Sequence, residues 1–344
     1  MGPGNPLQYT RSRDGTRIAW QDVGSGPAIL VVPSWPSTLA TQTWRWFVQR
    51  VWQGRTVVYD RRGFGASDWG VEHSVDRYVE DVEAVADAAG LERLVIYAIA
   101  NGSAEAVKLA ARSQRVTRML LAEPALHPEK EQHSEEAALV AMIDGDFRMF
   151  WSAMAQWILG WGSPGPVGAL VDRYLAATNP DDIRAFLAMH YSQVNLRPLA
   201  PMVRADCLIF HNAATSRSPS GPAEELARLI PNAWLLLGRE PKGWATHGEA
   251  EMLRNFLGGS RLVNESVDDH GPTVSHGIAH TGLTPREVEI LEALRTGKTN
   301  EELAEQFTLS KATVARHLAN IYGKLGVRNR VEATNWAAQQ AKQG

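Results

Sequence analysis

Residues 283–336 read LTPREVEILEALRTGKTNEELAEQFTLSKATVARHLANIYGKLGVRNRVEATNW and predict a small all-α domain of short helices. Thr284 is suited to cap a first helix that has Pro285 at its first position and Glu287 at its third. Gly297 ends this helix, and Asn300 is the predicted cap of a second. Apolar residues recur at helical spacing along both: Val288, Leu291, Leu294, Leu303, Ala304 and Phe307.

A third predicted helix follows a tight turn, and it has one apolar face and one free face. Ser310 is its predicted cap. The apolar face is formed by Val314, Leu318, Ile321 and Leu325. The free face centres on Arg316, flanked by Ala312, Thr313, Ala319 and Asn320, with His317 and Lys311 nearer its margins. Side chains of these kinds can reach base edges in the major groove of DNA.

This segment resembles the LuxR/FixJ-type helix-turn-helix family in LTPREVEIL, in the TV pair and His of the third helix, and in NIYGKLGVRNR. The resemblance implies a transcriptional regulator that binds double-stranded DNA through the third helix. Two positions depart from the family pattern. Ala315 stands where relatives often carry Lys, so more of the base reading falls to Arg316, and Thr308 stands where the turn usually has Gly. The alternative interpretation is a helical bundle used only for dimerisation.

The charge distribution favours the DNA-binding interpretation. Residues 281–344 hold nine Lys or Arg against seven Glu, and residues 311–344 hold six basic residues against Glu332 alone. Residues 1–280, with 26 Lys or Arg against 31 Asp or Glu, should not bind DNA. The predicted DNA contacts are Lys311, Thr313, Arg316, His317, Asn320, Lys324, Arg328 and Arg330, of which Lys311, Lys324, Arg328 and Arg330 are expected to contact phosphates.

Length and composition leave room for one large domain with a substantial core beside this small one, because the chain has 344 residues and is 44% hydrophobic. Cys207 is its single cysteine, so no disulfide forms within the chain, and a cytoplasmic location is expected. No signal peptide or membrane span is expected, since the uncharged stretch 149–171 is interrupted by GWGSPGP. Residues 259–280 predict a polar linker, whose three irregularly spaced His favour a solvated tether over a metal site.

Residues 1–258 alternate strand-like and helix-like segments, which predicts an α/β domain with a mainly parallel sheet covered on both faces. Helical patterns such as residues 76–89 and 104–111 lie between the apolar runs. The residues from about 127 to 201 break the alternation and predict a helical cap over the sheet. The predicted buried strands are residues 28–32, 56–59, 94–97, 119–121, 208–210 and 234–237.

Three segments of this domain, VVPSWP, YDRRGFGASD and VIYAIANGSAEAVKLA, resemble the alpha/beta-hydrolase family over most of residues 8–258. In that family a strand ends in a sharp turn, small-x-Ser-x-small, which exposes a serine nucleophile at the head of a helix. Here the turn reads AIANG, and Ala100 stands at the nucleophile position. Ser103, the nearest hydroxyl, is expected inside the following helix.

The other two positions of the family's catalytic triad are also changed. Thr215 ends the run in which the family acid usually lies, and Pro241 stands at the family histidine, with His247 six residues on. Glu123, at the end of a strand, is an alternative acid, but a His and a Glu without a hydroxyl or thiol give no covalent pathway. The sequence therefore predicts an inactive hydrolase homologue with no catalytic residue, cofactor or metal.

A hydrolase fold without its chemistry can keep its ligand pocket. The backbone amides of Trp35 and Asn101 do not depend on the lost serine, so they are expected to hold a carbonyl or carboxylate oxygen. The cap contributes an apolar stripe of Phe147, Phe150, Trp151, Met154, Trp157, Ile158 and Trp161, most of which are expected to pack in the core. The predicted ligand contacts are Ser34, Trp35, Ala100, Asn101, Trp151, Met154 and His247.

These patterns together predict a ligand-responsive transcriptional regulator. It has a hydrolase-like sensor domain in residues 1–258, a linker in residues 259–280 and a LuxR-type DNA-binding domain in residues 281–344. The ligand is predicted to be small and either apolar or carbonyl-bearing. Two alternatives stay open: an active esterase- or lactonase-like hydrolase with a DNA-binding tail, and a regulator whose hydrolase-like domain only dimerises. A homodimer is expected, because one module of this size reads only a short half-site.

Overall fold

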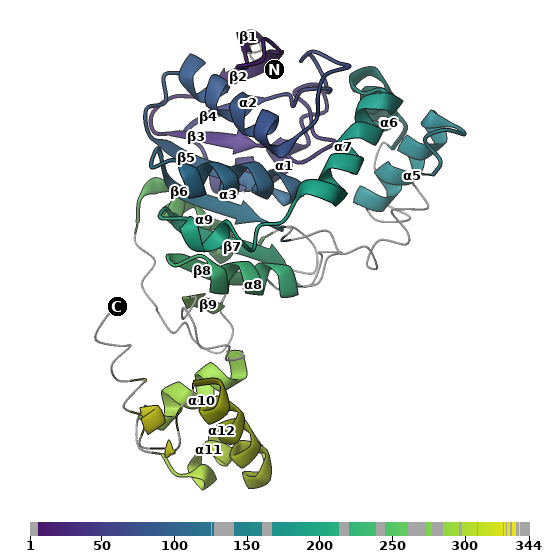
Figure 1. Ribbon diagram of the computed structural model, residues 1–344. Helices are drawn as coiled ribbons and strands as arrows, with labels where there is room; N and C mark the ends of the chain where they lie inside the picture. Colours follow the sequence, from purple (N-terminus) through teal and green to yellow (C-terminus); the bar gives the residue numbers. More distant parts are fainter. Residues whose placement is uncertain are drawn as a thin grey trace. The chain divides into compact units, whose positions relative to one another are not determined.

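The structure is a computed structural model that divides into two compact units, Met1–Gly277 and Ile278–Gly344 (Figure 1). It describes residues 6–124, 126, 141–159, 167–212, 220–238, 245–260, 273–276, 285–295, 298–307, 309–325, 327, 329–330, 332–334 and 337. In these ranges, no helix combines the length and the apolar character that a membrane crossing requires.

A nine-stranded sheet forms the centre of the larger unit as far as the chain is described, in the order β1-β2-β4-β3-β5-β6-β7-β8-β9. Its strands are β1 (Gln8–Arg11), β2 (Arg17–Val23), β3 (Ala28–Val32), β4 (Arg55–Tyr59), β5 (Leu94–Ile99), β6 (Val116–Ala122), β7 (Asp206–Asn212), β8 (Ala233–Gly238) and β9 (Thr273–His276). The six strands from β3 to β8 run parallel, and β1, β2 and β9 pair antiparallel at the two sides. The mainly parallel sheet expected from the apolar runs is confirmed.

Helices cover both faces of this sheet, because neighbouring residues of each central strand point to opposite sides. On one face, α2 (Val75–Ala88), α3 (Ser103–Arg112) and α8 (Gly221–Leu229) pack on strand residues such as Leu121 and Ile209. On the other face, α1 (Trp44–Val51) and α9 (His247–Gly258) pack on residues such as Leu120 and Phe210. Apolar side chains of each helix recur on one stripe, so each helix buries that stripe against the sheet.

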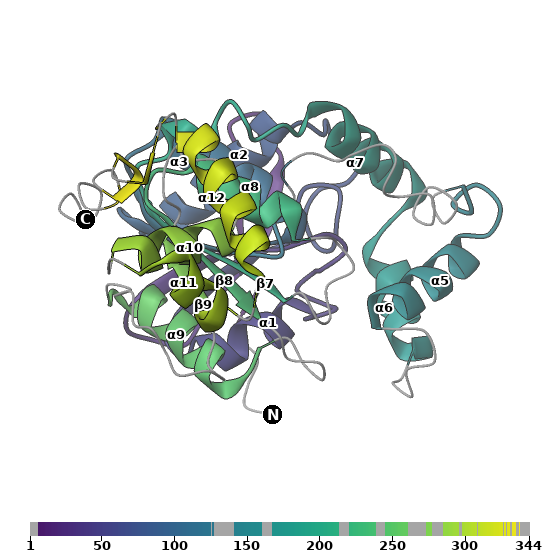
Figure 2. The ribbon, with the colours of Figure 1, turned by 90° about the horizontal axis from the view of Figure 1, so that it is seen from below.

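The predicted cap region contains three helices, α5 (Phe147–Leu159), α6 (Val167–Ala177) and α7 (Pro180–Gln193). They lie together at one side of the sheet in both views of the ribbon (Figures 1 and 2). Asn179 caps α7 by accepting a hydrogen bond from the Asp182 amide at 2.9 Å. Buried side chains of all three helices belong to the same apolar cluster as α2 and α3.

Part of the predicted linker belongs to the sheet. Thr273–His276 forms β9, which pairs with β8 from Trp234↔His276 to Leu237↔Thr273. The larger unit accordingly extends to Gly277, beyond the end of α9 at Gly258. The physical reason is that β8 would otherwise present an edge of unpaired backbone groups, which a short extended segment can satisfy whatever its polarity.

The smaller unit contains α10 (Pro285–Arg295), α11 (Asn300–Gln306) and α12 (Lys311–Leu325). Its core includes Ile290, Leu291, Leu294, Leu303, Val314, Leu318 and Ile321, as the predicted apolar faces require. The predicted cap of α11 is wrong by one residue: Thr299, not Asn300, is the N-cap. Thr299 forms a reciprocal capping box with Glu302, because a threonine with Glu three residues on satisfies two backbone donors at once. Ser310 caps α12 as expected, accepting from the Thr313 amide at 3.1 Å.

Candidate functional site

The turn after β5 has a strained backbone at Ala100, the residue that the sequence predicts at the nucleophile position. Ala100 has φ +46°, a left-handed conformation that is uncommon for a residue with a side chain. Gly102 follows on the buried side of the turn, where a Cβ would lie 2.7 Å from the Val32 carbonyl oxygen. Only glycine therefore allows α3 to start this close to β3. Ala100 itself is half-buried, so a methyl group stands at the tip of the turn.

Ser103 cannot replace the missing nucleophile in this arrangement. It lies inside the first turn of α3 as expected, and its residue is fully buried. Its hydroxyl donates to the Ala100 carbonyl oxygen at 2.7 Å and is therefore already engaged. A nucleophile also needs a base within hydrogen-bond reach. Ser103 serves instead to close the turn.

The predicted oxygen-binding amides are not both free. The Trp35 backbone N–H donates to the side-chain oxygen of Asn101 at 3.1 Å. Asn101 thus places its own amide oxygen where a ligand oxygen was expected, and this corrects the prediction for Trp35. A signal for this contact is present in the sequence, because an Asn directly after the predicted nucleophile position carries both a hydrogen-bond acceptor and a donor on a short side chain. Ser34, Trp35 and Asn101 are all half-buried.

Glu123 and His211 form a second polar arrangement at the same end of the sheet. Glu123 follows β6 with φ +53°, and its Oε1 accepts from the Asn212 backbone N–H at 2.8 Å. Its Oε2 lies 2.9 Å from Nδ1 of His211, which is 2% exposed. The sequence predicts Glu123 as an alternative acid but does not predict His211 as its partner. The available signal was that both residues end neighbouring parallel strands.

The predicted ligand contacts from the cap are core residues. Trp151 is fully buried and Met154 is 2% exposed. The Trp151 indole N–H donates to Thr178 at 3.0 Å, and its ring stacks on Tyr174 with centroids 4.4 Å apart. Trp35 packs against this cluster, 6.1 Å from the Trp151 ring centroid. The aromatic stripe of the cap therefore serves mainly to pack the cap onto the loop after β3.

His247 is exposed at the first residue of α9, and among the described residues no hydrogen bond or ion pair joins it to the turn. Thr215 and Pro241, the residues at the family's acid and histidine positions, lie outside the described residues, as do residues 213–219 and 239–244 around them. Trp161 lies outside them too, and the same holds for the side chains of Trp157 and Ile158. In the described part of the chain, no cluster of His, Cys, Asp and Glu has the makings of a metal site.

Buried charges hold the loops on which the turn rests. The Asp60 carboxylate accepts from the Leu39 amide at 2.6 Å and from the Ala66 amide at 2.8 Å. Burial raises the pKa of Asp60 to about 6, and these two backbone hydrogen bonds oppose the rise. Arg61 donates to the Pro33 carbonyl oxygen at 2.8 Å and pairs with Glu105 of α3. Asp60 and Arg61 thus tie the loops after β3 and β4 to each other and to the helix behind the turn.

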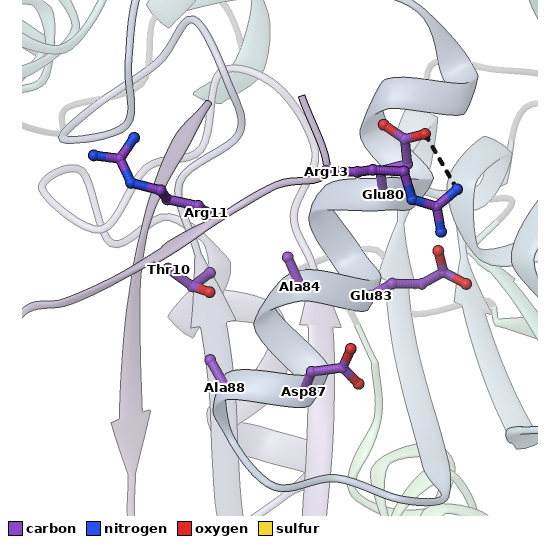
Figure 3. A pocket seen from close by; sticks show the side chains of 8 residues that line it. All are labelled: Thr10, Arg11, Arg13, Glu80, Glu83, Ala84, Asp87 and Ala88. Carbon is purple, nitrogen blue, oxygen red and sulfur yellow. Dashed lines mark ion pairs between the residues drawn. The ribbon is translucent and has the colours of Figure 1, made fainter. Parts of the chain in front are cut away.

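A groove of about 330 Å³ lies elsewhere, between β1 and α2 (Figure 3). Its lining is strongly charged: Thr10, Arg11, Arg13, Glu80, Glu83, Ala84, Asp87 and Ala88. Arg13 reaches across it to Glu80 at 3.8 Å. The groove lies along the outer strand of the sheet, whereas the turn lies at the carboxyl end of the central strands, so it is not the predicted ligand pocket.

The free face of α12 is solvent-exposed, as the predicted reading face requires. Arg316 and Asn320 are exposed and Thr313 and His317 are half-buried, while Ala315 and Ala319 also face solvent. Lys311 is exposed and lies 2.5 Å from Glu301 of α11. The side chains of Ala312, Lys324 and Arg328 lie outside the described residues.

Arg330 has a structural contact that the sequence did not predict. It donates to the Asn300 side-chain oxygen at 3.0 Å and to the Lys298 carbonyl oxygen. Asn300, the residue first expected to cap α11, is thus used to hold the segment after α12. Arg330 can still contact a phosphate only with the donors that these two bonds leave over.

A family model described as bacterial regulatory proteins of the luxR family matches residues 281–337. These residues form a LuxR-type DNA-binding domain. The chain is 47% identical over 55 residues to the probable csgAB operon transcriptional regulatory protein of Salmonella typhimurium, which covers 16% of this chain and 26% of that protein. The chain therefore spans about a quarter of the length of that curated regulator.

The larger unit has the alpha/beta-hydrolase fold. An alpha/beta hydrolase from Sphaerobacter thermophilus superposes with a TM-score of 0.55 at 24% identity, covering 72% of this chain and 99% of that structure. The chain is also 33% identical over 148 residues to a non-heme haloperoxidase of Rhodococcus erythropolis, over 40% of this chain and 52% of that protein. A LuxR-type DNA-binding domain is thus joined to a hydrolase-like domain in one chain.

Proposed function

We propose that this chain is a ligand-responsive transcriptional regulator whose hydrolase-like domain binds a small molecule without cleaving it. The observation that carries the proposal is the turn at Ala100, which retains its left-handed backbone while presenting a methyl group. A backbone held in a sparsely populated conformation persists only where its surroundings enforce it. The turn thus keeps the form of a binding site after the loss of the group that would react.

The chemistry around the turn supports binding over catalysis. Ser103 is buried and engaged with the Ala100 carbonyl, and the cysteine of the chain, Cys207, is buried in β7. Burial also raises the pKa of the Cys207 thiol, which keeps it protonated and unreactive. Loss of a nucleophile lowers turnover by several orders of magnitude. The haloperoxidase chemistry suggested by the name of one similar protein is accordingly not proposed for this chain.

The ligand that this site favours is small and largely apolar. Trp35 and Ala100 are half-buried, so both are accessible from outside the core. A carbonyl oxygen could bond to the Trp35 amide only by displacing the Asn101 side chain, because that amide already has an acceptor. Binding of a carbonyl-bearing ligand would therefore include a rotation of Asn101.

On the DNA side, the exposed face of α12 is the proposed reading surface. Arg316 and Asn320 contact base edges, and Lys311 contacts a phosphate by exchanging its contact with Glu301. Thr313 and His317 lie at the margin of this face, and Lys324 and Arg328 are proposed phosphate contacts on the grounds of sequence. The chain is proposed to act as a cytoplasmic homodimer, so that two modules read the two halves of an operator.

A second candidate function is favoured by one observation. Trp151 and Met154, the expected ligand contacts of the cap, are buried in the common apolar core. A cap packed this closely also suits a regulator whose hydrolase-like domain only dimerises.

Substitution at Ala100 distinguishes these candidates. An operator is first selected from random duplexes with the full chain, and a set of short esters, lactones, alcohols and phenols is then screened for changes in operator Kd. Ala100→Phe should abolish any response while leaving basal operator binding unchanged, because its ring would fill the tip of the turn. The matched control is Ala185→Phe on the exposed side of α7, which should respond as the unsubstituted chain does.

Hydrolysis is measured on the same ester and lactone probes. The unsubstituted chain should show no turnover, and Ala100→Ser should restore little, because His211 lies two strands away on β7 and Pro241 stands at the position predicted for the family histidine. Robust turnover by the unsubstituted chain would establish the enzyme. A response that survives Ala100→Phe would place the sensing site elsewhere, and the absence of any response would favour the dimerisation domain.

A further inference from the structure

Three residues with unusual properties lie in one row at the carboxyl end of the sheet. Ala100, Glu123 and His211 each come one position after the paired residues Ile99, Ala122 and Phe210. The strands β5, β6 and β7 are direct neighbours, and neighbouring strands lie about 4.8 Å apart. Glu123 therefore stands beside the tip of the Ala100 turn, and His211 lies one strand further, about 10 Å from Ala100. In open α/β sheets, ligands bind at this end of the strands.

Two residues of this row hold a conformation that only glycine adopts easily. Ala100 has φ +46° and Glu123 has φ +53°. Both have a Cβ, which in the left-handed region lies too close to the following carbonyl oxygen. Such strain clusters where a site must hold a side chain in a fixed place. At Glu123, the strained backbone directs the carboxylate onto the Asn212 amide and the His211 ring.

The Glu123 carboxylate favours one position for the hydrogen of His211, although its Oε2 lies close to Nδ1 without the alignment of a hydrogen bond. Nδ1 of His211 lies 2.9 Å from Oε2 of Glu123, and two facing acceptors would repel each other. Of the two neutral tautomers, this contact favours the one with the hydrogen on Nδ1, in which Nε2 presents a lone pair. Nε2 is buried and has no hydrogen-bond partner within the described chain. A buried acceptor without a donor is unfavourable, so this atom needs a group that donates to it.

Strand alternation shows to which face of the sheet His211 belongs. Its side chain follows Ile209 by two positions, so both point to the same face. Ile209 belongs to the apolar cluster that contains α3 and the cap residues Trp151 and Phe186. The unpartnered nitrogen therefore belongs to the face of the sheet that α2, α3 and α8 cover, whose apolar cluster continues into the cap.

We propose that His211, oriented by Glu123, is the polar contact of the ligand site, and that it accepts a hydrogen bond from a hydroxyl group of the ligand. The ligand class is an uncharged alcohol or phenol on an apolar body. This inference rests on the proposed ligand binding and names its chemistry. The site therefore favours ligands that donate a hydrogen bond over ligands that accept one. The Trp35 amide, which would bind a carbonyl oxygen of the ligand, already donates to Asn101.

Phenol and anisole test this chemistry, because they have the same ring and differ in the hydroxyl hydrogen. The full chain is labelled with ¹⁵N-histidine, and the His211 ring nitrogens are assigned by comparison with His211→Phe. The free protein should show the Nδ1–H form. Phenol should shift the Nε2 resonance, and anisole and acetate should bind at least tenfold more weakly than phenol. His211→Phe should lose the preference for phenol over anisole.

Glu123→Gln is the second variant, because it keeps an acceptor beside Nδ1 while removing the charge. It should retain phenol binding with a weaker Nε2 shift, and the ratio of its affinities for phenol and anisole should fall. If the pair of Glu123 and His211 served only the structure, this ratio would not change. Equal affinity for phenol and anisole would overturn the proposal, and so would an Nε2 resonance that phenol leaves in place because a bound water already donates to it. An equal loss of binding in His247→Gln would move the site to α9 and overturn it too.

The result also separates this inference from the proposed function. Phenol binding at His211 without any effect on operator affinity would support the site and contradict ligand-responsive regulation. An operator response that Ala100→Phe abolishes, with no phenol preference at His211, would support regulation and overturn the hydroxyl contact.

Discussion

Ala100 shows that the turn after β5 holds a strained backbone without a reactive side chain at its tip. An alanine in the left-handed region is strained by about 1 to 2 kcal/mol, and nothing in its methyl group relieves that strain. The surrounding residues impose it instead, because Gly102 must pass under the Val32 carbonyl for α3 to begin. At the scale of single residues, two features therefore define the site: the strained backbone at Ala100, and a buried polar atom without a hydrogen-bond partner in the described part of the chain, Nε2 of His211.

Arg316 is the residue on which DNA sequence preference should depend most. It is exposed at the centre of the reading face, with alanines at positions 315 and 319 that offer no hydrogen bonds. Arg316→Ala should weaken specific binding by about 1 to 3 kcal/mol and flatten base preference. Binding-site selection with both proteins measures this.

Lys311→Ala is the control for Arg316→Ala. It should weaken binding to all DNA sequences alike, because a phosphate contact carries no sequence information. The slope of the logarithm of the binding constant against the logarithm of the salt concentration should become shallower by about 1. An unchanged base preference in Arg316→Ala would show that another face of α12 reads the DNA.

Asp60 should make the larger unit less stable as the pH rises. Burial raises its pKa to about 6 in the folded chain, against 3.8 for an exposed aspartate. The folded state therefore holds the proton more tightly, and this stabilisation, about 3 kcal/mol, is present below pH 4 and is lost as the pH rises through 6. The free energy of unfolding, followed by tryptophan fluorescence in urea between pH 4 and 7, should fall more steeply for the unsubstituted chain than for Asp60→Asn. If the free energy of unfolding fell equally with pH in the two proteins, Asp60 would have the same pKa in the folded and unfolded chain.

At the scale of elements, the helix α11 depends on a cap that lies one residue before the expected one. Thr299→Ala should destabilise α11 by about 1 kcal/mol, which corresponds to roughly fivefold faster amide exchange in that helix. Hydrogen exchange in the full chain measures this, with Thr299→Ser as the variant that restores protection. If Asn300→Ala increased exchange at the start of α11 while Thr299→Ala did not, the cap would be Asn300 after all.

The elements that could be predicted from sequence are those whose own residues determine them. The runs 28–32 and 94–97 are apolar enough to be buried strands wherever they lie, and the structure places β3 and β5 there. β9 could not be predicted, because TVSH becomes a strand only through the free edge of β8. The same holds for the site. The alanine of the turn is visible in the sequence, whereas the Asn101 contact with Trp35 and the pairing of His211 with Glu123 join residues 66 and 88 positions apart.

At the scale of the whole molecule, the chain should be a homodimer that associates through its larger unit. In the described part of the smaller unit, the large apolar side chains are at least partly covered by its own small core. The clearly exposed ones lie in the larger unit: Leu7, Tyr9, Trp69, Met149 and Met202. An operator of two half-sites about 10 base pairs apart needs two modules, and a contact in the larger unit leaves both free to bind.

Light scattering on the eluting full chain checks this, with and without a duplex carrying the selected operator. The expected mass is twice the 37.8 kDa of one chain, and it should persist when residues 278–344 are removed, because the contact lies in the remaining unit. Abolishing one half-site should then lower operator affinity by far more than the twofold expected for two independent modules, since the second contact is made within an already bound dimer. A single chain that remains monomeric both free and on the operator would remove the dimer, and each DNA-binding domain would then have to read its site alone.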